Sequence, residues 1–229
     1  MFRKSARPIF LASSIATTLA ATATFTFCDW QQGFPQKLKA PVQSSPLLLS
    51  GVGMRRKNLY VMEVDVYLAA LNLSPEAFAQ SQAVYSNDVN ASIAEAIMTP
   101  VKNGSGCKAA VTLRFVRNVE KDKIVEAFND AFKGLDESDV IAFKGALSHT
   151  VGESGLKKGE EIAFFWTLNG VVITKNGEVG DKFKSTTGDG VERRLLEVYV
   201  DPRRAVSPEL LKSIKEHVGQ ASTLAFSSR

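Results

Sequence analysis

Cysteine and histidine are scarce in this chain of 229 residues, which contains two of each. Cys28 and Cys107 are far apart and lack the spacing of metal ligands, so the sequence predicts neither a disulfide framework nor a structural metal site. His149 follows a helical apolar stripe, and His217 lies near a helix C-terminus, where a cation suits the helix dipole. We therefore interpret both histidines as structural or solvated groups, and we expect no metal and no cofactor.

The main part of the chain also lacks an excess of charge of either sign. Arg3, Lys4 and Arg7 precede the first acidic residue, Asp29, and from there on 25 basic residues face 24 acidic ones. Nucleic-acid-binding domains are typically strongly basic, with Lys and Arg gathered on one face. This balance argues against nucleic-acid binding.

The glycine motifs that bind phosphate are missing as well. Residues 51–57, GVGMRRK, complete neither GxxxxGK[ST] nor GxGxxG. Local evidence favours a glycine turn with exposed arginines. The alternative is that the glycines allow a tight turn that aims one arginine across the sheet, where a guanidinium can receive a carboxylate or a phenolate. Neighbours on a strand face opposite sides, so at most one of Arg55 and Arg56 can point inward.

Residues 1–28 form a leader that is basic, then apolar, and free of acidic residues. Three interpretations compete: a secretory signal, a membrane span from Ile9 to Phe27, and an organelle transit peptide. Scattered Ser and Thr weaken the span, and the Ala/Ser/Thr-rich composition favours the transit peptide, with or without a membrane anchor. A disordered tail without a targeting role is the remaining alternative. We expect an organelle location, with the mitochondrion ahead of the plastid.

Residues 29–45 contain prolines and show little periodicity, which predicts a linker, so the folded domain is placed at 46–229. Within it, alternation and two Asn-Gly pairs predict strands, and apolar stripes and caps predict helices. The expected strands are 59–71, 107–117 and three consecutive strands within 160–179. The expected helices are one after Ser74, one at 91–98 that Pro100 stops, 120–132, 138–151, 190–200 and a last one that Ser207 caps. Hairpins without a repeated βαβ unit indicate an α+β fold with a largely antiparallel sheet and helices on one face.

Residues 51–71, GVGMRRKNLYVMEVDVYLAAL, resemble a strand pair of the chalcone isomerase family. Residues 205–218, AVSPELLKSIKEHV, are similar to its closing helix, and the segments between follow in the expected order, so the resemblance covers residues 46–218. The short distance from Arg55 to Tyr67 is more similar to the non-plant and fatty-acid-binding members. The resemblance implies an open-faced β-sandwich with a ligand cleft between a large sheet and a layer of helices. The matching residues of the strand pair are Gly51, Gly53, Arg55, Val66, Tyr67 and Leu68.

The resemblance also implies where a ligand is held. Arg55 matches the arginine that holds the anionic oxygen of the substrate in plant isomerases. An ungapped count places the other polar positions of the plant site at Met62, Glu120, Ala127 and Val198. Met cannot donate a hydrogen bond, and Glu opposes developing negative charge. One cation therefore remains in a cleft that has become more apolar.

This composition favours a non-catalytic binder of a fatty acid or a similar amphiphilic carboxylate. No residue has a catalytic role unless the isomerase interpretation holds, in which case Arg55 carries it. Two alternatives stay open: an intramolecular lyase of the chalcone–flavanone isomerase type, and a structural or interaction module whose own side chains fill the cleft.

Overall fold

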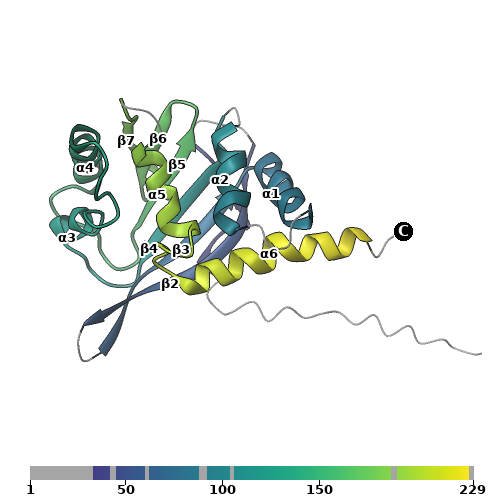
Figure 1. The fold of residues 1–229 in the computed structure, drawn as a ribbon. Coiled ribbons are helices and arrows are strands. Elements are labelled where there is room, and N and C mark those ends of the chain that lie inside the picture. The colour runs from purple at the N-terminus through teal and green to yellow at the C-terminus, as the bar shows by residue number, and fades with distance from the viewer. Residues whose placement is uncertain are drawn as a thin grey trace, which may run out of the picture.

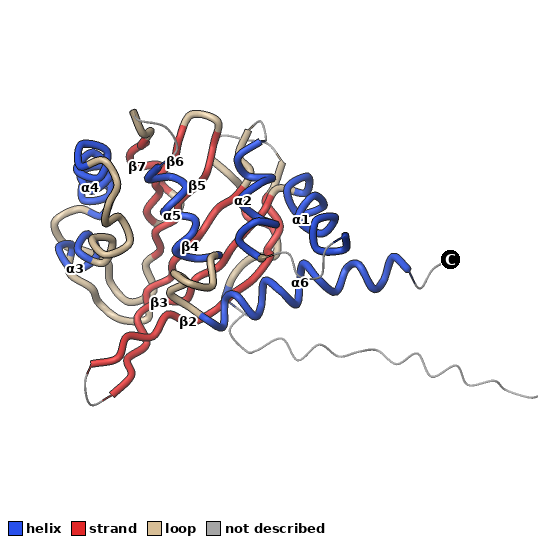
Figure 2. The backbone as a smooth tube through the Cα atoms, in the orientation of Figure 1, coloured by secondary structure: helices blue, strands red, loops and turns tan. Residues whose placement is uncertain are grey.

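The computed structural model describes residues 33–41, 45–59, 62–87, 92–103, 106–186 and 190–226, and the leader of residues 1–28 lies outside these ranges. The described residues form one antiparallel sheet whose strand order follows the sequence, with helices between the strands and after them (Figures 1 and 2). No helix in these ranges is long and apolar enough to cross a membrane. The strands are β1 (Lys37–Leu38), β2 (Leu47–Leu59), β3 (Met62–Leu73), β4 (Ala109–Phe115), β5 (Glu161–Thr167), β6 (Gly170–Lys175) and β7 (Glu178–Phe183). The helices are α1 (Pro75–Asn87), α2 (Ile93–Asn103), α3 (Lys121–Glu126), α4 (Glu137–Val151), α5 (Gly190–Val200) and α6 (Pro208–Phe226).

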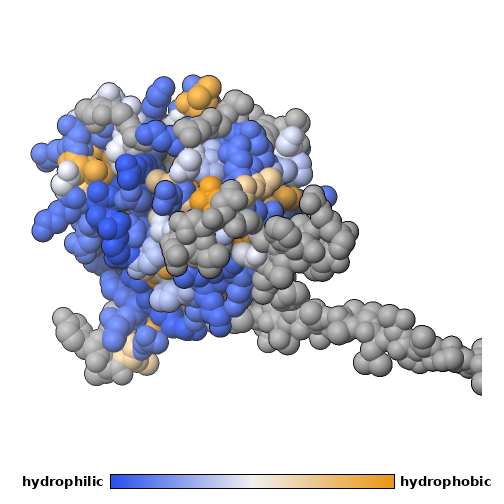
Figure 3. Space-filling model, turned by 45° about the vertical axis from the view of Figure 1, so that its right-hand side comes forward, coloured by the Kyte–Doolittle hydropathy of each residue, from blue (hydrophilic) through white to orange (hydrophobic). Residues whose placement is uncertain are grey.

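The main core lies between one face of the sheet and the helices. Opposed residues of neighbouring strands point to the same side, so Leu71, Val111 and Phe164 share this face. All six helices add side chains to the same cluster, among them Phe143 of α4 and Leu195 of α5. The helices gather on this side in Figure 1, and the surface in Figure 3 is mostly hydrophilic with isolated apolar side chains. The α+β class and the single helical layer are therefore confirmed.

Several local predictions are confirmed. β5, β6 and β7 form the three consecutive hairpin strands, and Asn176 and Gly177 have the positive φ values of 52° and 83° that such a turn requires. Ser74 Oγ accepts from Ala77 N and Ser207 Oγ accepts from Leu210 N, both at 3.1 Å, so both serines cap their helices.

Two helices differ in length from the prediction. α3 ends at Glu126, and turns continue to Gly134, whose φ is +83°. The expected burial of Phe128 and Phe132 still holds, because the turns keep both rings in the core. α2 runs through Pro100 instead of stopping there, and the proline itself is buried. Tertiary packing thus offsets the backbone hydrogen bond that proline removes.

Residues 33–41 belong to the fold, although their composition predicts a linker. β1 pairs with the start of β2, and Leu49 N donates to Gln36 O at 3.1 Å. Phe34 is 7% exposed, packs with Val52 and Ala70 on the face of the sheet opposite the helices, and stacks under the guanidinium of Arg114. The folded domain therefore begins before residue 46. Buried aromatic contacts outweigh the irregular composition here.

Residues 51–57 lie inside strand β2 and do not form a turn. Gly51 and Gly53 face α6, and a Cβ atom at position 53 would lie 2.1 Å from Leu210 N. The glycines therefore allow α6 to contact the strand backbone, which is a different role from the expected turn. The side chains of α6 also cover the free edge of β2: Val52 N donates to Ser213 Oγ and Met54 N to Glu209 Oε2, both at 3.1 Å.

This close approach gives a stability prediction. Gly53→Ala should lose about 1–3 kcal/mol of unfolding free energy, because the added methyl group forces α6 away from β2. Gly145→Ala is the matched control, since Gly145 lies in α4 with open space around it and should gain up to about 1 kcal/mol. Urea denaturation measures both. Equal stability of Gly53→Ala and the wild type would contradict the proposed role of the glycine.

Candidate functional site

Arg55 lies where β2 and β3 leave the body of the sheet as a two-stranded ribbon, which extends to the lower left in Figure 1. It is paired with Tyr67 of β3, and Tyr67 is paired with Phe115 of β4. All three side chains face the helices, since residues opposite one another share a face. The rings of Tyr67 and Phe115 are 5.5 Å apart, so Arg55 is adjacent to the aromatic edge of the core.

A β-bulge separates the two arginines. Arg55 is paired with Tyr67 but Arg56 with Asp65, so Val66 is the extra residue. In a regular strand, residues two positions apart face the same side of the sheet. The bulge breaks this rule, so Tyr67 and Asp65 face different sides. Arg56 Nε donates to Asp65 Oδ1 at 3.0 Å, and Arg56 Nη1 donates to Glu209 Oε1. The positive charge of Arg56 is therefore compensated by two carboxylates, those of Asp65 and Glu209.

Arg55 has different surroundings. Its side chain is half-buried, and Nη1 donates to the carbonyl oxygen of Val206 at 2.9 Å. No carboxylate in the described ranges pairs with it. A guanidinium that is partly removed from water and lacks an anion is unfavourable by itself, and it gains free energy from any anion that can reach it. This contrast agrees with the prediction that Arg55 is the inward arginine of the pair.

Two tyrosine hydroxyls complete the site. Burial raises the pKa of Tyr67 to about 12, against the opposing effects of the positive charge of Arg55 and a hydrogen bond with Tyr199. Burial is also the main reason why the pKa of Tyr199 lies well above its ordinary value. Both phenols therefore stay neutral at physiological pH, and because the hydrogen bond between them uses one O–H group, the other remains available as a donor. The site consists of one guanidinium and two phenols against an apolar wall.

Three of the other four predicted cleft positions have exposed side chains. Met62 begins β3 at the outer end of the ribbon and is 61% exposed. Glu120 and Ala127 flank α3 with exposed side chains, and only Val198 of α5 is buried in the core. An ungapped count misses Tyr67 as a site residue, because only the pairing of the hairpin puts it opposite Arg55.

Other reactive side chains lie apart from this site. Burial raises the pKa of the Cys107 thiol to about 12, which leaves it un-ionised and unreactive. His149 is exposed and lies 2.7 Å from Asp181, while His217 Nδ1 is 2.8 Å from Ser213 O in its own helix. Within the described ranges no three His, Cys, Asp or Glu side chains are grouped so that they could hold a metal ion.

Comparison with known proteins gives a family and a fold. The family model described as chalcone isomerase-like matches residues 31–205. No curated protein matches the chain. The crystal structure of a fatty-acid binding protein from Arabidopsis thaliana is similar, with a TM-score of 0.61 and 17% identity, over 84% of this chain and 94% of that one. At this identity the similarity concerns the fold, and it confirms the open-faced arrangement of sheet and helices.

The phenol of Tyr67 has a measurable signature. A tyrosine in an unfolded chain ionises near pH 10, about two pH units below the folded value. The neutral phenol thus stabilises the folded state fully below about pH 10, and this contribution is lost as the pH rises through about 12. We predict that the phenolate absorbance of Tyr67→Phe and of the wild type coincide up to about pH 11 when folded, but differ near pH 10 in urea. A difference near pH 10 in the folded proteins would show that Tyr67 is solvated.

Proposed function

Because the chain belongs to the chalcone isomerase-like family, we propose that it is a non-catalytic binder of a fatty acid or a similar amphiphilic carboxylate. Arg55 holds the carboxylate. The observation that carries this proposal is the half-buried guanidinium of Arg55, which lacks an anionic partner among the described residues and lies beside two neutral phenols. The similar protein from Arabidopsis thaliana, which is named a fatty-acid binding protein, supports the same class of ligand.

The chemistry of the site suits a carboxylate head group. A carboxylate accepts hydrogen bonds at both oxygens, so it can take two N–H groups of the guanidinium and still accept from a phenol. The hydrogen bond to Val206 O involves only Nη1, and no described residue takes the remaining donors of Arg55, so the ligand can accept from them. Because Tyr67 and Tyr199 have raised pKa values, neither phenol competes with the ligand as an anion.

The apolar tail of the ligand extends into the layer between sheet and helices. Phe115 lies beside Tyr67, and Ile124 of α3 and Phe128 of the turns after α3 belong to the same cluster. Each methylene that leaves water for this layer contributes about 0.8 kcal/mol. The aromatic side chains pack against one another in this structure, so ligand entry has to separate them.

Substitution of Arg55 tests the proposal. Arg55→Ala should weaken the binding of a fluorescent fatty acid roughly 30- to 150-fold, or about 2–3 kcal/mol, because the charged hydrogen bonds are lost. Arg55→Lys should recover only part of the affinity, since it keeps the charge but loses the planar fork. Arg56→Ala is the matched control, and its affinity should stay within about threefold, because Asp65 and Glu209 already hold that side chain.

Two results would contradict the proposal. Equal losses at positions 55 and 56 would mean that the arginines act through the general charge of the ribbon. Conversion of naringenin chalcone above its spontaneous rate would instead support the intramolecular lyase, because the phenols beside Arg55 would then stabilise an enolate.

The location of the protein is proposed from the sequence alone. Residues 1–28 act as an organelle targeting signal, because they are basic at the start and free of acidic residues. A mitochondrial destination is favoured over a plastid. A fluorescent protein fused to residues 1–45 should enter the organelle, and the same fusion with Arg3, Lys4 and Arg7 replaced by Gln should not. A cytosolic or secretory location of the first fusion would exclude an organelle targeting role for residues 1–28.

A further inference from the structure

We infer that a groove between α2 and α5 is a second ligand site, which takes a neutral amphiphile with a hydroxyl head group. The groove has a volume of about 770 Å³, within the range of small-molecule pockets. Its apolar lining includes Met98 of α2, Leu196 of α5 and Trp166 of β5. The part of α2 that lines it runs from Ala94 to Lys102, or about 12 Å at 1.5 Å per residue, which suits an alkyl chain of medium length.

This groove is separate from the Arg55 site. Trp166 is paired with Ala109 at one end of β4, whereas Tyr67 is paired with Phe115 at the other end. Six residues of a strand correspond to about 20 Å. The inference therefore does not depend on the proposed function, and each site can be tested without the other.

Two buried polar atoms in the wall of the groove have no hydrogen-bond partner among the described residues. They are Oε2 of Glu192 and Oγ of Ser185, in residues that are 9% and 8% exposed. They are close together, because Ser185 N donates to the other oxygen of the same carboxylate at 2.6 Å. A buried polar atom without a hydrogen bond is unfavourable, so a ligand that satisfies both atoms removes this cost.

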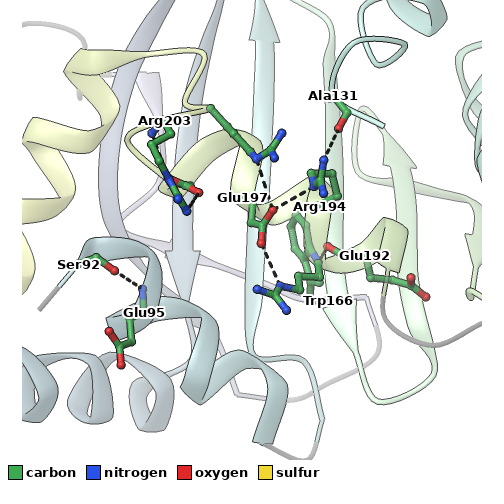
Figure 4. A network of polar contacts seen from close by, with 11 residues as sticks. Ser92, Glu95, Ala131, Trp166, Glu192, Arg194, Glu197 and Arg203 are labelled. Carbon is green, nitrogen blue, oxygen red and sulfur yellow. Dashed lines mark hydrogen bonds and ion pairs between the residues drawn. The ribbon is translucent and has the colours of Figure 1, made fainter. Parts of the chain in front are cut away.

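Glu197 of α5 and Asp201 after it, which also line the groove, are already satisfied. Glu197 lies among three arginines, with Arg193 Nε at 2.9 Å and Arg194 Nε at 3.1 Å from its oxygens (Figure 4). Asp201 is paired with Arg203 at 3.0 Å. Lys184, a lining cation that has no ion pair among the described residues, is exposed at the rim, where water screens it. Glu192 therefore determines which head group can enter between α5 and residues 184–186.

The chemistry of these two atoms selects a hydroxyl group. A hydroxyl group on the ligand can donate its hydrogen to Glu192 Oε2. The oxygen of that ligand hydroxyl can in turn accept a hydrogen bond from the hydroxyl of Ser185. A carboxylate would repel Glu192 and offers no hydrogen to it. The groove thus has the opposite preference to the Arg55 site, because it favours an alcohol over a fatty acid with the same tail.

Trp166 provides a local probe of the groove. The full chain contains two tryptophans, so Trp30→Phe leaves Trp166 as the single emitter. 1-Decanol and decanoate have equal tails and should be titrated separately into this protein. Decanol should shift the emission of Trp166 in a saturable way, at a concentration at least about tenfold lower than decanoate requires.

Variants identify the polar atoms. In the Trp30→Phe background, Glu192→Gln keeps the acceptor for Ser185 N but removes the charge, and it should reduce the preference for decanol to less than about threefold. Ser185→Ala should weaken decanol binding about three- to tenfold, because one hydrogen bond is lost. Glu137→Gln and Ser154→Ala change exposed residues outside the groove and are the matched controls. An emission that does not respond to decanol, an equal response to decanoate, or an unchanged preference in Glu192→Gln would overturn the inference.

Discussion

The contact between α6 and β2 determines the geometry of the candidate site. Gly51 and Gly53 have no side chains, so the helix backbone comes as close to the strand as van der Waals radii allow. Glu209 then reaches both Met54 N and Arg56, and the residue before the cap, Val206, presents its carbonyl oxygen to Arg55. A side chain at position 53 would move all of these groups at once. The two glycines thus influence the position of Arg55 indirectly, through the placement of α6 and of Val206.

The bulge at Val66 places the two neighbouring arginines, Arg55 and Arg56, in different surroundings. Arg56 is exposed enough to be screened and has two carboxylates, so it contributes to the attachment of α6. Arg55 faces the apolar layer, where electrostatic interactions are stronger because water is partly excluded. The same residue type therefore has a structural role at one position and a proposed binding role at the next. α5 also has two roles, since Tyr199 faces the Arg55 site while Glu192 and Leu196 line the groove.

The sequence predicts most of the fold, because the determining signals are local. Asn-Gly pairs fix the hairpins of β5 to β7, and Ser74 and Ser207 cap helices through atoms three residues away. The role of residues 51–57 could not be read locally, since the partner of each glycine is more than 150 residues further along the chain. The packing of Phe34 on the sheet is equally non-local. Of the candidate site, Arg55 was predictable from the resemblance, but Tyr67 and Tyr199 depend on strand register and on the docking of α5.

The central claim is that Arg55 holds a carboxylate in a partly apolar layer. The most direct measurement is carbon NMR of a fatty acid labelled at its carboxyl carbon and bound to the purified full chain, followed over a pH titration. Pairing with a guanidinium favours the ionised form, so the bound signal should differ from that of the free acid and should titrate well below the ordinary pKa of a carboxyl group. The same signal should be absent from Arg55→Ala. A bound signal that titrates like the free acid, or one that persists in Arg55→Ala, would contradict the account.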